Sequence, residues 1–264
     1  MRSTHRRAGC AVADEGGIAE ANTRSSAIRQ AVLRAVGPAT TPIGSLVGVY
    51  TDRPHAVLTF DDGPQAGATD AVLAALAERS ATATFFVLVE RVEREPRLLA
   101  EIVAAGHEVG MHGIDHRRLS ALPAGEVRSA LAEGKARLQD QLGLPVRWFR
   151  PPHGAQTPRV WRAIRAQGLE PVLWSACAWD WLPRPVESLA TQALLGLDRG
   201  AVLLAHDGLA WDESGTGQRT APEIDRGELV RRVLDGMAER GLAARSLGEA
   251  LRYGRPRKVP WFRR

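Results

Sequence analysis

Two neighbouring acids and two nearby histidines are the residues of this sequence whose types and spacing could do chemistry. Asp61 and Asp62 directly follow the apolar run Ala56–Phe60, and His112 and His116 lie about fifty residues further along the chain. One carboxylate and two imidazoles can hold a divalent metal ion and leave one coordination position open. The other carboxylate then stays available as a base toward water activated by the ion. The pattern indicates a metal-dependent hydrolase.

Each motif has an ordinary alternative explanation when taken by itself. An Asp-Asp pair before Gly63 and Pro64 is also typical of a tight turn. Short patterns such as His-x-x-x-His often arise by chance. Zinc metalloproteases share this histidine spacing, but they place a glutamate directly after the first histidine, where this chain has Gly113. The sequence therefore argues against a metalloprotease.

The elements that would position these residues alternate regularly from Pro54 onward. Short apolar runs alternate with longer stretches of helical period, which is typical of βαβ units and a parallel sheet. The predicted strands are Ala56–Phe60, Thr82–Leu88, Glu108–Met111, Val146–Phe149, Pro171–Ser175, Ala201–Ala205 and Leu242–Ser246. The predicted helices are Thr69–Arg79, Pro96–Ala105, Ala124–Leu142, Pro158–Gln167, Val186–Leu197 and Glu223–Arg240. These units predict an α/β fold, a distorted (β/α)7-type barrel of parallel strands.

The candidate site residues lie just beyond the ends of these strands. In parallel α/β barrels, the loops at the carboxyl ends of the strands build the active site. Five predicted strands are followed, in chain order, by Asp61 and Asp62, His112, Arg150, Asp180 and Trp181, and His206. We therefore expect these segments to meet at one rim of the barrel.

One domain accounts for most of the chain. Residues 1–45 predict a flexible tail with one docking helix near residues 27–36. Residues 46–254 predict the barrel domain, and residues 255–264 predict a solvated basic tail. Contact of that tail with an anionic membrane surface is the less favoured alternative, suggested by Trp261 and Phe262 among arginines.

Charge and cysteine usage exclude several classes of protein. The net charge of +5 lies largely in the two end segments, so it does not predict a nucleic-acid-binding face. Cys10 and Cys177 are far apart and predict neither a disulfide framework nor a zinc–cysteine site. No apolar run reaches the ~18 residues of a membrane span, and no signal-peptide core is present. A cytoplasmic location is expected, or secretion if the start is misassigned; the oligomeric state stays open.

Together, the motifs resemble those of the polysaccharide deacetylases, the NodB-homology family also called carbohydrate esterase family four. The resemblance runs from about Val57 to Leu251 and follows the family's motif order. The matching segments are Thr59-Phe-Asp-Asp-Gly63, Ala83-Thr-Phe-Phe86, Ala105-Gly-His-Glu-Val109, His112–His116, Arg150-Pro-Pro-His-Gly154, Asp180-Trp181 and Leu204-Ala-His206. The resemblance implies a distorted barrel of βα units. It also implies removal of an acyl group, usually acetyl, from a nitrogen or hydroxyl of a sugar.

The resemblance further implies which residues would hold the metal and activate water. Asp62, His112 and His116 would bind one divalent ion, with zinc favoured and cobalt, nickel or manganese as alternatives. Asp61 would be the catalytic base. Arg150 would pair with Asp61 and keep it ionised.

Other residues would serve the leaving group and the substrate. His206 would protonate the leaving nitrogen, held in its charged form by Asp180. A backbone N–H near His153 would stabilise the oxyanion. Trp181 and Leu204 would wall a small pocket for the acyl methyl group. Trp211, in the polar stretch after His206, could stack on a sugar ring.

The chain departs from the family pattern at three positions. Gly113 stands where a hydroxyl residue usually braces the metal loop, so another group must orient the ligands. Cys177 replaces a usual aspartate and removes one carboxylate, and His153 replaces a frequent tyrosine.

The substrate of a metal-dependent deacetylase of this kind would be an acetylated sugar or glycan. Two alternatives stay open beside it. One is an amidase or deformylase acting on a small molecule or a lipid-linked sugar. The other is a catalytically silent carbohydrate-binding homologue, which the presence of all the proposed ligands and catalytic groups argues against. The sequence names neither the glycan nor the acylated atom.

Overall fold

The computed structural model describes residues 43–210 and 222–263. The strands are β1 (Ser45–Tyr50), β2 (His55–Asp61), β3 (Thr84–Leu88), β4 (Glu108–Gly113), β5 (Trp148–Phe149), β6 (Glu170–Pro171), β7 (Ala176–Cys177), β8 (Val202–His206), β9 (Ala243–Arg245) and β10 (Arg255–Val259). The helices are α2 (Ala68–Glu78), α3 (Val89–Arg94), α4 (Pro96–Ala104), α5 (Ala124–Leu142), α6 (Pro158–Ala166), α7 (Val186–Leu195), α8 (Arg226–Glu239) and α9 (Leu247–Arg252). Two short 3-10 turns are η1 (Leu119–Ala121) and η2 (Pro152–Gly154).

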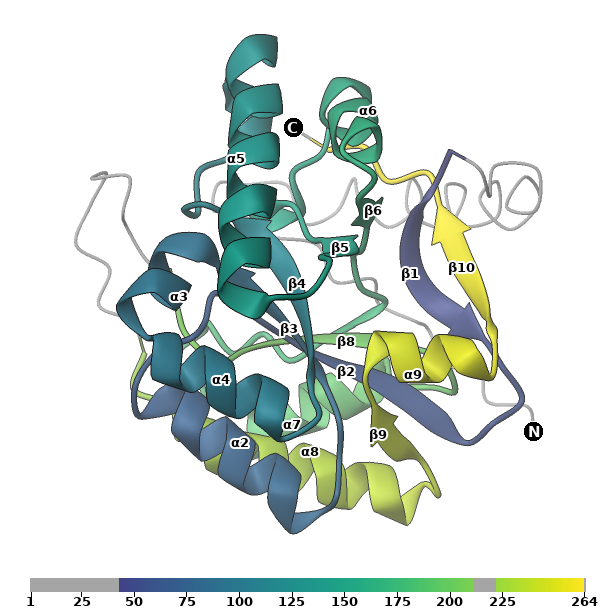
Figure 1. The fold of residues 1–264 in the computed structure, drawn as a ribbon. Helices are drawn as coiled ribbons and strands as arrows, with labels where there is room; N and C mark the ends of the chain where they lie inside the picture. Colours follow the sequence, from purple (N-terminus) through teal and green to yellow (C-terminus); the bar gives the residue numbers. More distant parts are fainter. Residues whose placement is uncertain (1–42, 211–221, 264) are drawn as a thin grey trace.

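The main sheet has eight parallel strands. Seven lie in the order β6-β5-β4-β3-β2-β8-β7, and β9 pairs with the beginning of β2. The sheet curls, and helices pack on its outer side (Figure 1). The predicted α/β class with a distorted parallel barrel is confirmed. Each predicted strand overlaps an observed one, whereas β1, β7, α3, α9 and β10 were not predicted.

Alternate residues of the central strands enter two different cores. Leu58 and Phe60 of β2 pack with the outer helices, whereas Val57 points to the opposite face and packs with Phe86 and Trp148. β2 and β3 are buried along their whole length. Parallel strands that are covered on both faces are expected to be largely apolar, as the runs Ala56–Leu58 and Phe85–Leu88 are. This packing fixes the strand ends at which the site residues lie.

The C-terminal segment differs from the predicted solvated tail. β10 pairs antiparallel with β1, and β1 in turn bridges to Val172 and to Ala201 of the main sheet. Trp261 packs 5.6 Å from Trp174 between ring centroids, and its carbonyl accepts a hydrogen bond from the buried Gln156 side chain. Strand pairing therefore continues past the predicted boundary after residue 254. The pairing joins segments about 200 residues apart, which no local pattern reveals.

The described helices include none that is both long enough and apolar enough to cross a membrane.

Candidate active site

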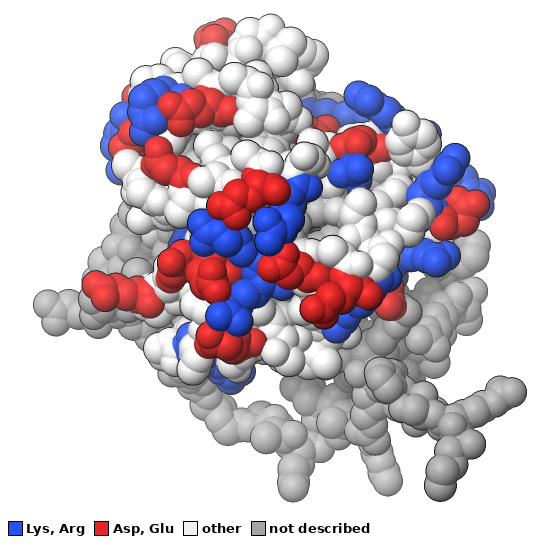
Figure 2. Space-filling view, turned by 90° about the horizontal axis from the view of Figure 1, so that it is seen from below, with Lys and Arg blue, Asp and Glu red and all other residues white. Residues whose placement is uncertain are grey.

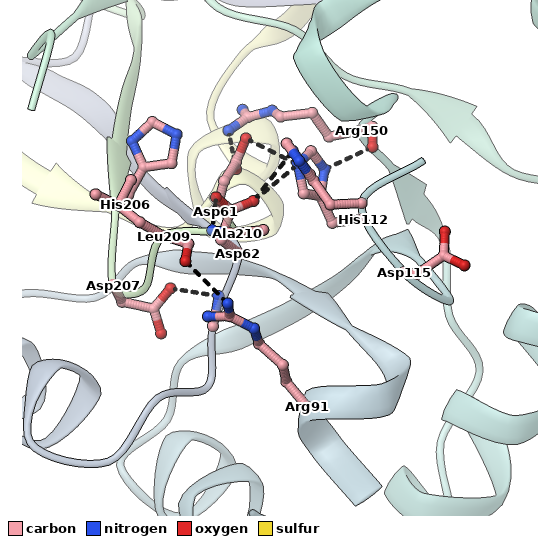
Figure 3. A network of polar contacts seen from close by, with 12 residues as sticks. Asp61, Asp62, Arg91, His112, Asp115, Arg150, His206, Asp207, Leu209 and Ala210 are labelled. Carbon is pink, nitrogen blue, oxygen red and sulfur yellow. Dashed lines mark hydrogen bonds and ion pairs between the residues drawn. The ribbon is translucent and has the colours of Figure 1, made fainter. Parts of the chain in front are cut away.

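Three side chains from two segments of the chain converge as the ligands of a metal ion would. Asp62 follows β2, His112 lies in β4, and His116 lies in the loop after β4. One ligand atom from each lies within 4.8 Å of the other two. Asp62 Oδ1 is 3.3 Å from His112 Nε2 and 3.4 Å from His116 Nε2. Figure 3 shows Asp62 and His112 facing each other across the rim.

One buried oxygen in this cluster lacks a hydrogen-bond donor. Asp62 Oδ1 is buried and accepts no hydrogen bond from the described residues, while Oδ2 accepts one from the Ala210 amide at 2.9 Å. Buried carboxylate oxygens are nearly always partnered. An unpartnered oxygen between two imidazole nitrogens is what a bound cation would complete, and one carboxylate with two imidazoles suits zinc. The residues therefore fit a divalent metal ion.

The protonation states of the ligands also suit a cation. Burial lowers the pKa of His116 to about 4, so its imidazole is neutral at pH 7 and offers a nitrogen lone pair. Burial alone would raise the pKa of Asp62, but the nearby His116 and His112 outweigh it and hold that pKa well below its usual range. Asp62 is therefore ionised at neutral pH.

His112 is oriented by a backbone carbonyl. Its Nδ1 donates a hydrogen bond to the Arg150 carbonyl at 2.8 Å, which turns Nε2 toward Asp62. The next residue, Gly113, has a φ of 124°, and a Cβ there would lie 2.6 Å from the Asp115 carbonyl oxygen. A hydroxyl residue does not fit this backbone. The Arg150 carbonyl is thus the orienting group that the loss of the usual hydroxyl requires.

Asp61, the predicted base, lies beside a fully buried arginine. Arg150 donates to Asp61 Oδ1 at 2.6 Å and to the Thr59 hydroxyl at 2.8 Å. Its other nitrogens donate to the carbonyls of Val172 and Leu173. A guanidinium held by this many acceptors has one orientation, so it fixes the Asp61 carboxylate as well. The pairing expected for Arg150 is present, and Asp61 Oδ2 is left facing His112 Nε2 at 3.8 Å.

His206, the predicted acid, is held by a second buried carboxylate. Its Nδ1 donates to Asp180 Oδ1 and its amide donates to Asp180 Oδ2, both at 2.8 Å. Arg226 of α8 donates to the same Oδ2 at 2.9 Å and to the His206 carbonyl at 2.7 Å. Burial would lower the pKa of His206, but the Asp180 carboxylate outweighs it and raises that pKa to about 9. The ring is therefore an imidazolium at neutral pH.

Aromatic side chains surround this centre on two sides. The Trp181 ring lies edge-on to His206 at 5.5 Å and stacks with Trp179 at 5.6 Å between centroids. The exposed His153, in the left-handed conformation at φ 59°, places its ring 4.3 Å from that of His116. Leu204 is buried in the inner core, and Trp181 packs against the same cluster. His153 and Trp181 therefore lie beside the centre, whereas Leu204 belongs to the inner core.

Trp211 lies outside the described residues, so its stacking on a sugar stays a prediction.

The sequence interpretation missed two buried residues that support the site. Arg226 was placed in a helix without a role. Asp207 accepts hydrogen bonds from the Gly63 amide at 3.1 Å and from the Thr69 hydroxyl at 2.8 Å, which ties the loop after Asp62 to β8. Burial raises the pKa of Asp207 to about 6. Its place directly after His206 was the only available signal.

Cys177, which replaces a usual aspartate, is a buried free thiol in register with Leu204 of β8.

Comparison with known proteins places this geometry in a family. The family model described as polysaccharide deacetylase matches residues 48–172. A chitooligosaccharide deacetylase of Azorhizobium caulinodans is 30% identical over 206 residues, covering 78% of this chain and 98% of the relative. The chain belongs to the polysaccharide deacetylase family. It is thus an enzyme-family member whose relatives remove acyl groups from carbohydrates, as the motifs predicted.

Two further polysaccharide deacetylase relatives show how far the likeness extends. The peptidoglycan-N-acetylglucosamine deacetylase PgdA of Listeria monocytogenes is 36% identical over 150 residues, which cover 57% of this chain and 32% of that protein. A pseudoenzyme of carbohydrate esterase family four from Bacillus anthracis has a TM-score of 0.69 at 21% identity, with 80% of this chain and 70% of that chain covered. The second likeness concerns the fold alone. Activity must therefore be argued from the site.

Proposed function

We propose that this polysaccharide deacetylase homologue is a metal-dependent hydrolase that removes N-acetyl groups from N-acetylglucosamine residues of a glycan. The observation that carries the proposal is the unpartnered, buried Asp62 Oδ1 between His112 and His116, beside the Asp61–Arg150 pair. The names of the relatives, chitooligosaccharide deacetylase and peptidoglycan-N-acetylglucosamine deacetylase, support the substrate class.

The proposed reaction begins at Asp61 and the neighbouring metal ligands. Asp62, His112 and His116 would hold a divalent ion, which would supply Lewis-acid polarisation of water and of the substrate carbonyl. Asp61 accepts a proton from the attacking water. Arg150 keeps Asp61 pointed toward the rim, since its guanidinium is fixed by the surrounding carbonyls.

The reaction ends with proton transfer to the leaving group. An amine leaves poorly unless it is protonated, so cleavage of an amide needs an acid. The imidazolium of His206 donates that proton from Nε2, because Nδ1 is bound to Asp180. Asp180 and Arg226 keep the ring in place throughout, since both are buried and bonded to one another.

The substrate side of the site has two expected contacts. The carbonyl oxygen that becomes negatively charged would accept a hydrogen bond from a backbone N–H near His153. The acetyl methyl would pack against Trp181 and Leu204, which are apolar and lie beside the acid. A larger acyl group would need more room at this wall. Both roles are part of the proposal.

Release of acetate from N-acetylated chito-oligosaccharides by the purified protein tests the proposal. Turnover should be lost after chelation and should return when zinc, cobalt, nickel or manganese is added singly, which also ranks the metals. Turnover that resists chelation would remove the metal from the mechanism. A metal-loaded protein that binds the oligosaccharide without releasing acetate would favour the carbohydrate-binding alternative. Release from small formylated amides only would favour the deformylase alternative.

A further inference from the structure

A cleft of about 650 Å³ beside the catalytic centre has no part in the mechanism above. Three arginines line it, Arg118, Arg159 and Arg162, together with the hydroxyl-bearing Ser120 and Thr157. None of the described residues that line the cleft is acidic. The cleft is therefore positively charged and rich in hydrogen-bond donors.

The walls of the cleft continue directly from the catalytic loops. Arg118 follows His116 by two residues, a separation that spans at most about 7 Å of extended chain. Thr157 follows His153 by four residues on the other wall. The rings of His116 and His153 lie 4.3 Å apart, so the two walls begin at one place. A glycan bound at the metal centre would pass this cleft with a neighbouring sugar.

Hydrogen bonds hold one guanidinium across the cleft without neutralising it. Arg159 donates to the Leu122 carbonyl at 2.8 Å and to the Ser120 carbonyl at 3.5 Å, which joins the start of α6 to η1. These acceptors are neutral, so the positive charge is positioned but not paired with an acid. The Thr157 oxygen accepts from the Val160 amide, and its hydroxyl hydrogen can donate elsewhere.

On the outer helical surface, by contrast, arginines pair with acidic side chains. Figure 2 shows basic and acidic side chains interleaved on the face formed by the helices below the sheet. There Arg79 pairs with Asp235 at 2.8 Å, and Arg231 pairs with Glu78 at 3.0 Å. Arg159 and Arg162 lie three positions apart on α6 and pair with no acid of the described residues, so their charges repel one another and a bound anion would relieve that repulsion.

We propose that the arginine cleft is a subsite for an anionic group, a carboxylate or a phosphate, on the sugar next to the one that is deacetylated. Guanidinium groups match the planar or tetrahedral oxygens of both anions with paired hydrogen bonds. The inference rests on the proposed function and deepens it, because it separates acidic glycans from neutral chito-oligosaccharides as substrates.

The test compares three N-acetylated oligosaccharides on the metal-loaded enzyme. One is a neutral chito-oligosaccharide, one carries a lactyl carboxylate on the neighbouring sugar, and one carries a phosphate there. The variants are Arg162→Gln and the matched control Arg128→Gln, an exposed arginine of α5 that does not line the cleft. The wild type should favour at least one anionic substrate in kcat/KM by about fivefold or more, mainly through a lower KM.

The expected results distinguish an effect on binding at the cleft from an effect on the catalytic centre. Arg162→Gln should remove most of that preference and leave the neutral substrate unchanged, whereas Arg128→Gln should keep the preference. Whether the carboxylate or the phosphate gains more identifies the source of the anion. Equal rates on all three substrates, or equal effects of the two variants, would overturn the subsite.

Calorimetric titration with the same oligosaccharides keeps the two proposals distinguishable. If no substrate is deacetylated, tighter binding of an anionic one that Arg162→Gln weakens would uphold the subsite and count against the proposed function alone. Binding that does not depend on the anionic group would overturn the subsite even if the neutral substrate is turned over.

Discussion

Two carboxylates near opposite ends of the sheet, the half-buried Glu108 and the buried Asp62, differ in their hydrogen-bond partners. Glu108 begins β4, and its oxygens accept hydrogen bonds from the Trp148 ring at 2.7 Å, the Gly248 amide at 2.8 Å and the Thr84 hydroxyl at 2.9 Å. Asp62, which follows β2 and lies beside His112 near the other end of β4, keeps one oxygen without a donor among the described residues. Glu108, which holds the structure, thus has both oxygens hydrogen-bonded, whereas Asp62, which faces a ligand, has one oxygen without a donor.

The largest effect should come from Asp62→Asn. An amide presents no anionic ligand, so bound metal should fall below one equivalent and kcat/KM should fall by about 10⁴-fold or more. The free energy of unfolding of the metal-free protein should not fall, since Oδ1 gives up no hydrogen bond. Metal analysis, acetate release and denaturant unfolding measure these quantities.

A matched control for this variant lies in the same loop. Asp115→Asn removes a carboxylate that pairs with Arg117 and points away from the centre in Figure 3, so metal content and activity should stay. A large loss of stability in metal-free Asp62→Asn would break the comparison, because Asp62 would then be a structural acid like Glu108.

The second-largest effect, expected for Asp61→Asn, distinguishes the role of a catalytic base from that of a metal ligand. Activity should fall by about 10² to 10³-fold because the proton acceptor is lost, while one metal equivalent remains bound. Stability should fall by about 3 kcal/mol, since Arg150 is fully buried and loses its carboxylate partner. Loss of the metal in this variant would show that both acids are ligands.

The third effect concerns pH. The pKa of His206 is raised to about 9, so the acid is protonated at pH 7 and activity should fall as pH rises through that value. In Asp180→Asn the main charge that raises this pKa is gone, and burial then lowers it. The basic limb of kcat/KM should move to lower pH, with a loss of about 30-fold at pH 8 if the pKa returns to its ordinary value. An unmoved limb would exclude His206 as the acid.

The smallest effect on activity should come from Glu108→Gln. The glutamine side chain has only one oxygen, so at least one of the three donors loses its acceptor. The free energy of unfolding should therefore fall by about 1 to 3 kcal/mol. Metal content and kcat should stay, since the change lies near the far end of β4. Glu133→Gln, at an exposed pair with Arg137, serves as control with a change below about 0.5 kcal/mol. Lost metal in Glu108→Gln would refute the division of roles.

Much of the site could be predicted because parallel strands impose a rule on the chain. Apolar runs located β2, β4 and β8, and side chains that follow parallel strands must meet at one edge. Asp61, Asp62, His112 and His206 were found in this way before any geometry was available. Arg150 followed from the same rule, although its burial did not.

The remainder depended on contacts between segments far apart in the sequence. The basic segment of β10 lacks the alternation of a buried strand, and only its pairing with β1 makes it part of the fold. The buried bond from Arg226 to Asp180 joins α8 to the loop before α7, and nothing near Arg226 in the sequence signals it.

The sequence by itself determined the class of fold, the family and the chemical types gathered at the rim, because strand length and side-chain chemistry are local properties. Only the tertiary structure decided which oxygen of Asp62 stays open, which carbonyl turns His112, and where arginines gather along a cleft. Those properties depend on which groups find partners, and partners come from distant parts of the chain.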